Sequence, residues 1–131
     1  MPRRKSRTLT ELELEIMQTI WQLGEATVEQ LYDVFQDSGK PLARPSIRTM
    51  LKILQQKKYV TRNQEGRGYV YHPKVSAPEA HRSFLSDLLE RAFDGSATSM
   101  VATLLHGGMI SKGDLKEVKQ LTRKHEGGKR K

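Results

Sequence analysis

Three amphipathic helical patterns followed directly by a β-hairpin pattern occupy residues 10–73, and this order constrains the fold most. The hairpin pattern, YVTRNQEGRGYVYHP, has two runs rich in Val, Thr and Tyr, a glycine-containing turn around Glu65 to Gly68, and a closing Pro73. Three helices followed by a hairpin of this length is the order of a winged helix-turn-helix, in which the hairpin is the wing. We therefore predict this fold for residues 1–75.

Local signals mark where the three helices start. They are two capping boxes and a first-turn proline: Thr10 with Glu13, Thr27 with Gln30, and Pro45. In a capping box two side chains bond backbone amides that a helix start leaves unsatisfied, and proline is well tolerated in a first turn. The first helix should begin at Thr10 and end at Gly24, the second should run from about residue 28 to 37, and the third should carry SIRTMLKILQQKK.

A second group of helical patterns follows Val75. Ser76 and Glu79 form another capping box, Asp94 and Gly95 end that helix, and a short helix and a last helix capped by Ser111 come after it. The predicted fold class is therefore mainly α (α+β), a winged helix-turn-helix domain followed by a C-terminal helical region at 76–125. We expect a disordered basic tail at 126–131.

The C-terminal region has more apolar side chains than about 50 residues of one chain can bury. They are Phe84, Leu85, Leu88, Leu89, Phe93, Met100, Val101, Leu104 and Leu105. Because unburied apolar patches usually mark interfaces, we expect these side chains to form a homodimer. The alternative for the stripe from Phe84 to Phe93 is an internal core.

Positive charge is concentrated in one segment of a chain whose net charge is +8. Residues 8–39 hold seven acidic side chains and no Lys or Arg, whereas residues 40–74 hold nine Lys or Arg and one acid, Glu65. Such a block is typical of a surface that binds a polyanion, because neutralising phosphates releases condensed counterions.

Helical spacing gives the third helix an apolar stripe and an opposite polar face. The stripe contains Ile47, Met50, Leu51 and Leu54, and the polar face contains Ser46, Arg48, Thr49 and Lys52. Arg and Lys bind phosphates or guanine edges, and Ser and Thr bind phosphates or bases, so this face suits a recognition helix in a major groove. A solvated helix face is the alternative.

The predicted contacts to double-stranded DNA follow from the position of each side chain in this motif. The residues are Arg44, Ser46, Arg48, Thr49, Lys52 and Arg67. The first four are close to the bases because the N-terminal residues of a recognition helix lead into the groove, and Lys52 reaches a phosphate. Arg67, at the hairpin tip, would enter the flanking minor groove. The basic arm of Arg3, Arg4, Lys5 and Arg7 would add backbone contacts.

Several classes of function are disfavoured by what the sequence lacks. Cysteine is absent, and His72, His81, His106 and His125 have no metal-ligand spacing. No serine stands in a nucleophile elbow, so we predict no enzymatic activity and no cofactor. No segment approaches the roughly 18 to 20 apolar residues of a membrane span, which predicts a cytoplasmic protein without membrane insertion. A winged-helix adaptor or an RNA-binding protein remains the alternative.

Four segments carry a resemblance to a known family. The segments LTELELEIMQTIW, GEATVEQLYDVF, LARPSIRTMLKILQQKKYV and GRGYVYHPKVS resemble the penicillinase-repressor family, the BlaI and MecI type, over essentially the whole chain. The resemblance implies a repressor whose winged helix binds a two-fold symmetric operator and whose C-terminal helices dimerise, with FDGSATSMVATLL as the dimerisation segment. Pro45 departs from the family, whose members usually carry Thr or Ser there.

The resemblance also implies how repression is relieved. In the family a membrane sensor-protease cuts the dimerisation region at an Asn-Phe bond. Aligning SMVATLLHGGMIS with that region places Thr103 and Leu104 at the cleaved bond, so neither side chain of the family's bond is present.

Overall fold

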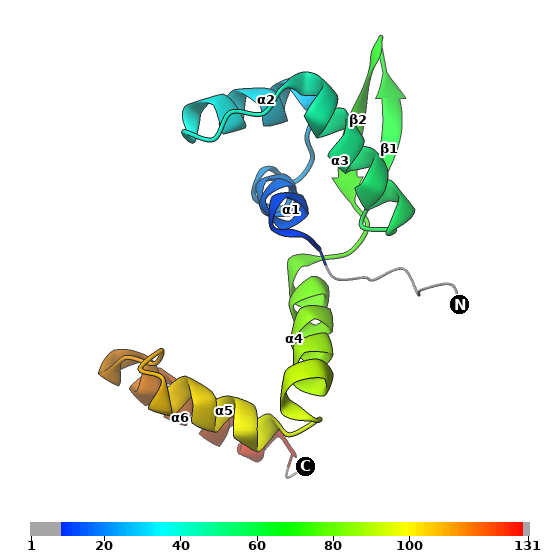
Figure 1. Ribbon diagram of the computed structural model, residues 1–131. Helices are drawn as coiled ribbons and strands as arrows, with labels where there is room; N and C mark the ends of the chain where they lie inside the picture. Colours follow the sequence, from blue (N-terminus) through cyan, green and yellow to red (C-terminus); the bar gives the residue numbers. More distant parts are fainter. Residues whose placement is uncertain (1–8, 130–131) are drawn as a thin grey trace, which may run out of the picture. The chain divides into compact units, whose positions relative to one another are not determined.

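The computed structural model describes residues 9–129 and the side chains of residues 9–127 (Figure 1). The basic arm of Arg3, Arg4, Lys5 and Arg7 lies outside the described residues. The elements are α1 (Glu11–Leu23), α2 (Val28–Asp37), α3 (Arg44–Gln56), β1 (Val60–Glu65), β2 (Gly68–Pro73), α4 (Ala77–Phe93), α5 (Ala97–His106) and α6 (Lys112–Lys129). The predicted class, mainly α (α+β) with a winged helix-turn-helix, is confirmed.

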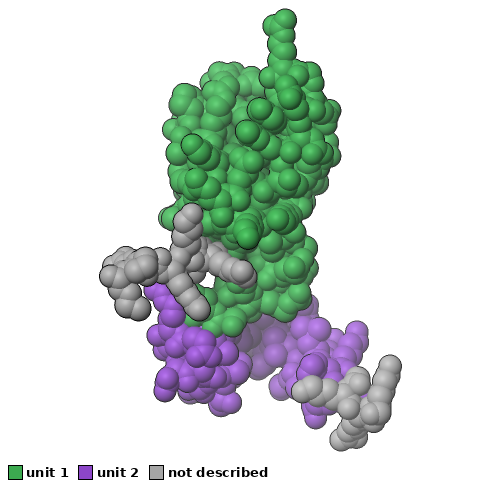
Figure 2. Space-filling model, turned by 90° about the vertical axis from the view of Figure 1, so that its right-hand side faces the viewer, with its two compact units in different colours: residues 1–87 green, residues 88–131 purple. Residues whose placement is uncertain are grey.

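Two compact units make up the chain, one ending at Asp87 and the other beginning at Leu88 (Figure 2). The first unit contains α1, α2, α3 and the β1–β2 hairpin, and α4 begins in it. The second contains the end of α4 with α5 and α6. The division between the units therefore falls within α4.

Capping boxes start α1 and α2 where the sequence predicted them. Thr10 Oγ1 accepts from the Glu13 amide at 3.2 Å, and the Thr10 amide donates to Glu13 Oε1 at 3.1 Å. The same pair of bonds joins Thr27 and Gln30, at 3.1 and 2.9 Å. Gly24 ends α1 with φ of 88°, a conformation that glycine adopts without strain.

The core of the first unit lies among α1, α2, α3 and the base of the hairpin. Its fully buried large side chains are Ile16, Met17, Ile20, Leu31, Ile47, Leu51 and Leu54. The predicted apolar stripe of α3 thus faces this core, although Met50 is only partly buried. One ion pair is also enclosed, since Lys57 Nζ lies 2.7 Å from Glu13 Oε1.

The wing is an antiparallel pair in which Val60 is opposite Pro73 and Glu65 is opposite Gly68. Gly66 is the first of the two turn residues and has φ of 61°, as a type II′ hairpin turn requires of that position. An isolated bridge between Ala26 and Tyr71 ties the base of the hairpin to the segment that precedes α2.

The first unit extends past residue 75, where the sequence placed the boundary, because the start of α4 packs on the winged fold. Ala80 is fully buried, and the Phe84 ring lies 6.5 Å from the Tyr59 ring, centroid to centroid. Trp21 Nε1 donates to the Val75 carbonyl at 2.9 Å. The junction between hairpin and α4 is therefore part of this unit's packing.

In the second unit α5 is the predicted short helix, and α6 is the predicted last helix, with 18 residues. The Ser96 hydroxyl caps α5 through the Ser99 amide at 3.1 Å, and the Ser111 hydroxyl caps α6 through the Asp114 amide at 3.0 Å. Gly107 follows α5, where an added Cβ would lie 2.8 Å from the Thr103 carbonyl oxygen, so a side chain there requires the backbone to shift. No helix in the described part of the chain is long and apolar enough to cross a bilayer.

α6 continues to Lys129, whereas the sequence suggested a disordered tail from residue 126. Glycine weakens a helix but does not by itself end one, and cationic side chains near a C-terminus interact favourably with the helix dipole. Residues 130 and 131 of that expected tail lie outside the described residues.

Candidate nucleic-acid interface

The polar face of α3 is exposed along its length. Ser46, Arg48, Thr49 and Lys52 are all exposed to solvent. The Thr49 hydroxyl donates to the Pro45 carbonyl one turn earlier at 3.0 Å, so its proton is used within the helix and its oxygen remains available as an acceptor. The helix therefore offers cations and small polar groups on one side and its packed stripe on the other.

A groove of about 960 Å³ runs between this face of α3 and the hairpin. It is lined from α3 by Arg48, Lys52 and Gln55, from the hairpin by Arg62, Arg67 and Tyr69, and from the start of α2 by Thr27 and Glu29. The structure thus brings together three of the predicted contacts, Arg48, Lys52 and Arg67, although they come from different elements. Around this concave surface the four cationic side chains outnumber the two acidic ones, Glu29 and Glu65, which suits an anionic polymer.

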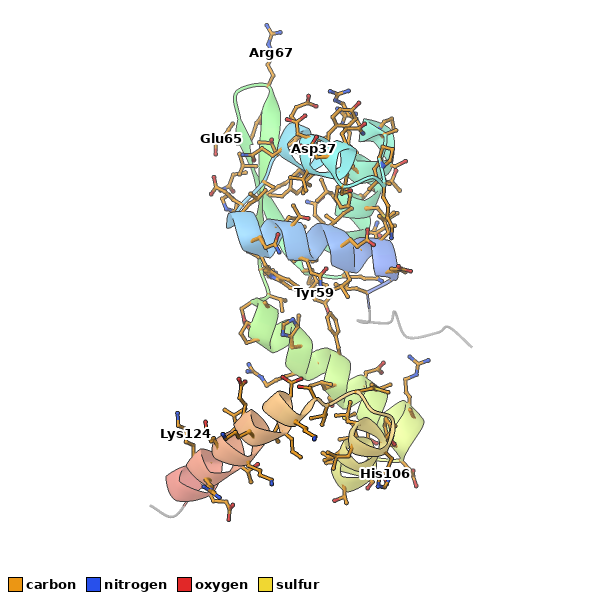
Figure 3. The ribbon with its side chains drawn as sticks, turned by 90° about the vertical axis from the view of Figure 1, so that its left-hand side faces the viewer. Asp37, Tyr59, Glu65, Arg67, His106 and Lys124 are labelled. Carbon is orange, nitrogen blue, oxygen red and sulfur yellow. The ribbon has the colours of Figure 1, made fainter. Side chains whose placement is uncertain are left out.

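Arg67 lies at the tip of the wing, after Gly66 in the turn, and its side chain points away from the rest of the unit (Figure 3). Such a cation at the end of a narrow two-stranded ribbon can approach a groove without steric hindrance from the protein. The minor-groove contact of Arg67 stays a prediction.

Arg62 is a cation of the groove that sequence reasoning missed. Its guanidinium lies 3.9 Å from the centroid of the Tyr69 ring. A hydrogen bond to Tyr71, with the nearby tyrosines, raises the pKa of Arg62 above its ordinary value. The cross-strand register, which places Arg62 opposite Tyr71, would have revealed this cluster, because directly opposed residues share a sheet face.

Arg44, by contrast, is bound within the protein. Its Nε and one terminal nitrogen both donate to the Glu29 carboxylate, the second at 2.9 Å, and its guanidinium lies 3.8 Å from the Tyr32 ring centroid. The sequence grouped Arg44 with the base contacts, but the acidic partner in α2 was not visible to that reasoning. Glu29 and Tyr32 are one helical turn apart, and this spacing was the available signal.

The predicted dimerisation residues divide between the two units. Phe84 packs on Tyr59 in the first unit, which corresponds to the internal-core alternative for this side chain. Leu85, Leu88, Val101 and Leu105 are exposed, and Leu89, Phe93, Met100 and Leu104 are partly exposed. Further exposed apolar side chains, which the prediction did not include, are Met109, Val118 and Leu121.

The bond between Thr103 and Leu104 lies inside α5. The Thr103 hydroxyl donates to the Ser99 carbonyl at 2.9 Å, and the Thr103 carbonyl accepts from the Gly107 amide at 2.9 Å. The bond is therefore held in helical conformation.

Among the side chains that the structure describes, no three His, Asp or Glu residues are placed to hold a metal ion.

Comparisons with known proteins agree over nearly the whole chain. A family model described as penicillinase repressor matches residues 9–124. The penicillinase repressor of Bacillus licheniformis is 24% identical over 127 residues, which cover 97% of this chain and 98% of that protein. An uncharacterized 16.5 kDa protein of Latilactobacillus sakei is 26% identical over 113 residues, which cover 86% of this chain and 77% of that protein. The solution structure of the DNA binding domain of the repressor BlaI superposes with a TM-score of 0.51 at 25% identity, covering 59% of this chain and 93% of that domain.

Proposed function

Because the chain belongs to the penicillinase repressor family, we propose that it is a sequence-specific transcriptional repressor that binds a two-fold symmetric operator as a homodimer. The observation that carries the proposal is the groove lined by Arg48 and Lys52 of α3 and by Arg62 and Arg67 of the wing. The protein acts in the cytoplasm, on double-stranded DNA, and has no catalytic role.

In this proposal α3 enters the major groove and the wing follows the adjacent backbone. Arg48, near the N-terminal end of α3, reads a base edge, for which arginine bound to guanine is the commonest pairing. Lys52, one turn further along, contacts a phosphate. Two copies related by a two-fold axis place two such helices on half-sites about 34–36 Å apart, so the operator is a palindrome.

Replacing Arg48 by Ala should weaken binding to the operator by about 1–3 kcal/mol and relax the preference at one base position in each half-site. Lys52→Ala should instead weaken binding to every sequence and flatten the dependence of log affinity on log salt by about one unit per lost contact. Selection of duplexes from a random pool by the wild-type chain, followed by titrations at several salt concentrations, measures both effects. If the two variants lose affinity for selected and random duplexes equally, Arg48 does not read bases.

The resemblance to BlaI and MecI implies relief of repression by a membrane sensor-protease, and we propose that α5 is where this chain is cut. A cut between about Ala102 and Leu105 would divide the exposed apolar surface of the second unit, and the separated wings would lose the advantage of binding two half-sites together. The backbone hydrogen bonds around Thr103 must open before the chain can be cut. Gly107 and Gly108 at the end of α5 favour this local unfolding.

Mass spectrometry of the protein from induced cells tests this proposal. The expected result is a pair of fragments divided within α5 that appears as repression is lost. An intact chain of 131 residues during full derepression would reject cleavage and favour a ligand or a partner protein as the inducer.

A further inference from the structure

The contacts of Arg44 join the first turn of α2 to the first residue of α3. Glu29 receives two hydrogen bonds from the Arg44 guanidinium, and Tyr32 stacks against it. A bidentate pair fixes the orientation of both planar groups, and the aromatic ring limits the guanidinium further. The hydrogen bond lowers the pKa of Glu29 and raises that of Arg44, so both groups are charged at neutral pH.

The start of α3 packs on the core through Leu42 and Ile47, but no side chain caps it. Ala43 occupies the N-cap position and makes no side-chain cap, whereas α1 and α2 each start with a complete capping box. The capping box of α2 fixes the turn that carries Glu29. Through its bonds to Glu29, Arg44 therefore helps to fix the N-terminal end of α3, which has no side-chain cap, relative to α2.

Glu29 also lies beside Arg48, which follows Arg44 by one helical turn. Both Glu29 and Arg48 line the groove, and the charge of Arg48 contributes to the lowered pKa of Glu29. The guanidinium groups of Arg44 and Arg48 are one helical turn apart and repel each other, and the Glu29 carboxylate beside them reduces this repulsion. Arg44 is held by the carboxylate, whereas Arg48 is exposed to solvent in the groove.

We propose that Arg44 is a positioning residue, held by Glu29 and Tyr32, which orients the N-terminal end of α3 so that Arg48 meets its base. Arg44 then makes no DNA contact of its own. The inference rests on the proposed function, since it assigns different roles to two arginines of the same recognition helix. An exposed ion pair adds little to folding stability, so losing it should leave the first unit folded and allow its effect on recognition to be measured.

Titration of the full-length chain with two duplexes of equal length tests the proposal. One duplex is selected from a random pool by the wild-type protein, and the other has a random sequence. Arg44→Ala should weaken binding to the selected duplex on the order of tenfold, which is typical of coupling within one hydrogen-bond network. Affinity for the random duplex and the salt slope should stay unchanged, because no phosphate contact is lost.

Two further variants separate orientation from charge. Arg44→Lys keeps the positive charge but cannot form the planar bidentate pair, so it should behave like Arg44→Ala. In a Glu29→Gln background, Arg44→Ala should have little additional effect, because both changes break the same link. Thermal unfolding followed by Trp21 fluorescence, with Trp21 in α1, checks that each variant keeps the fold of the first unit.

Three results would overturn the inference. One is equal weakening on both duplexes with a flatter salt slope, as expected for Lys52→Ala. Another is full recovery of affinity by Arg44→Lys, and the third is no effect of Arg44→Ala on either duplex. If the wild-type chain selects no preferred duplex, the proposed function fails instead, and the two failures are thus distinguished.

Discussion

Leu88→Asp is expected to convert the protein from a dimer to a monomer and to lower operator affinity by about a hundredfold or more. Leu88 belongs to the exposed apolar set of the second unit and is itself 47% exposed. A carboxylate there would be desolvated at the proposed interface without a partner. Two half-sites bound by one dimer benefit from a high effective concentration, and separate wings lose that benefit.

Sedimentation at micromolar concentration measures the first effect, and titration with the selected duplex measures the second. Ser86→Asp is the matched control, because Ser86 is exposed and lies two residues away, on the opposite side of the same helix. The control should remain dimeric and bind normally. A wild-type monomer under these conditions, or an unchanged mass for Leu88→Asp, would contradict the proposed dimer.

Removal of the Glu13 carboxylate should destabilise the first unit by about 3 kcal/mol, since breaking a buried pair leaves a charge that solvent reaches poorly. The Glu13 side chain is 5% exposed and the Lys57 side chain 17%. Glu13→Ala also removes the acceptor for the Thr10 amide. Thermal unfolding followed by Trp21 fluorescence should show a melting temperature lower by more than about 10 °C.

Glu15→Ala is the control for this substitution. Glu15 lies two residues along α1 and pairs with Lys40 at 3.6 Å, but the Lys40 side chain is 73% exposed. Exposed pairs contribute little, so this variant should melt close to the wild type. Equal losses in Glu13→Ala and Glu15→Ala would show that burial of the Glu13 pair is not the cause.

The Glu13 pair should also make stability depend on pH in the acid range. Burial alone raises the pKa of the Glu13 carboxyl, but the hydrogen bonds from Lys57 and Thr10 and the charge of Lys57 outweigh it, so the pKa lies below its ordinary value. The stabilisation is therefore present above the pKa of the unfolded chain and is lost as the pH falls through the lower folded value. Glu13→Gln should show a smaller loss of melting temperature on acidification than the wild type.

The parts of the fold that the sequence predicted are those that local signals encode. The capping pairs at Thr10 and Thr27 and the turn at Gly66 depend on residues within a few positions of one another. The end of the first unit does not, because it is set by contacts of Ala80 and Phe84 with residues distant in the sequence. Helical periodicity cannot reveal which earlier element a new helix packs against.

The same distinction applies to the candidate site. The exposed face of α3 follows from spacing within one helix, and Arg48 and Lys52 lie on it as predicted. The state of Arg44 depends on Glu29, fifteen residues earlier, and on the angle at which two helices meet. The place of Arg62 depends on strand register. A sequence shows which cations are present but not which of them are held by an internal partner.

The exposed apolar face of the second unit affects how steeply repression depends on the amount of protein. If this face is covered only when two copies meet, the concentration of DNA-binding species rises with the square of the protomer concentration at low abundance. Operator occupancy then responds more steeply to synthesis and degradation than it would for a monomeric repressor. A moderate fall in the amount of protein would release the controlled genes over a narrow range, so side chains such as Val101, 48% exposed, and Leu121, 63% exposed, would sharpen the regulatory response.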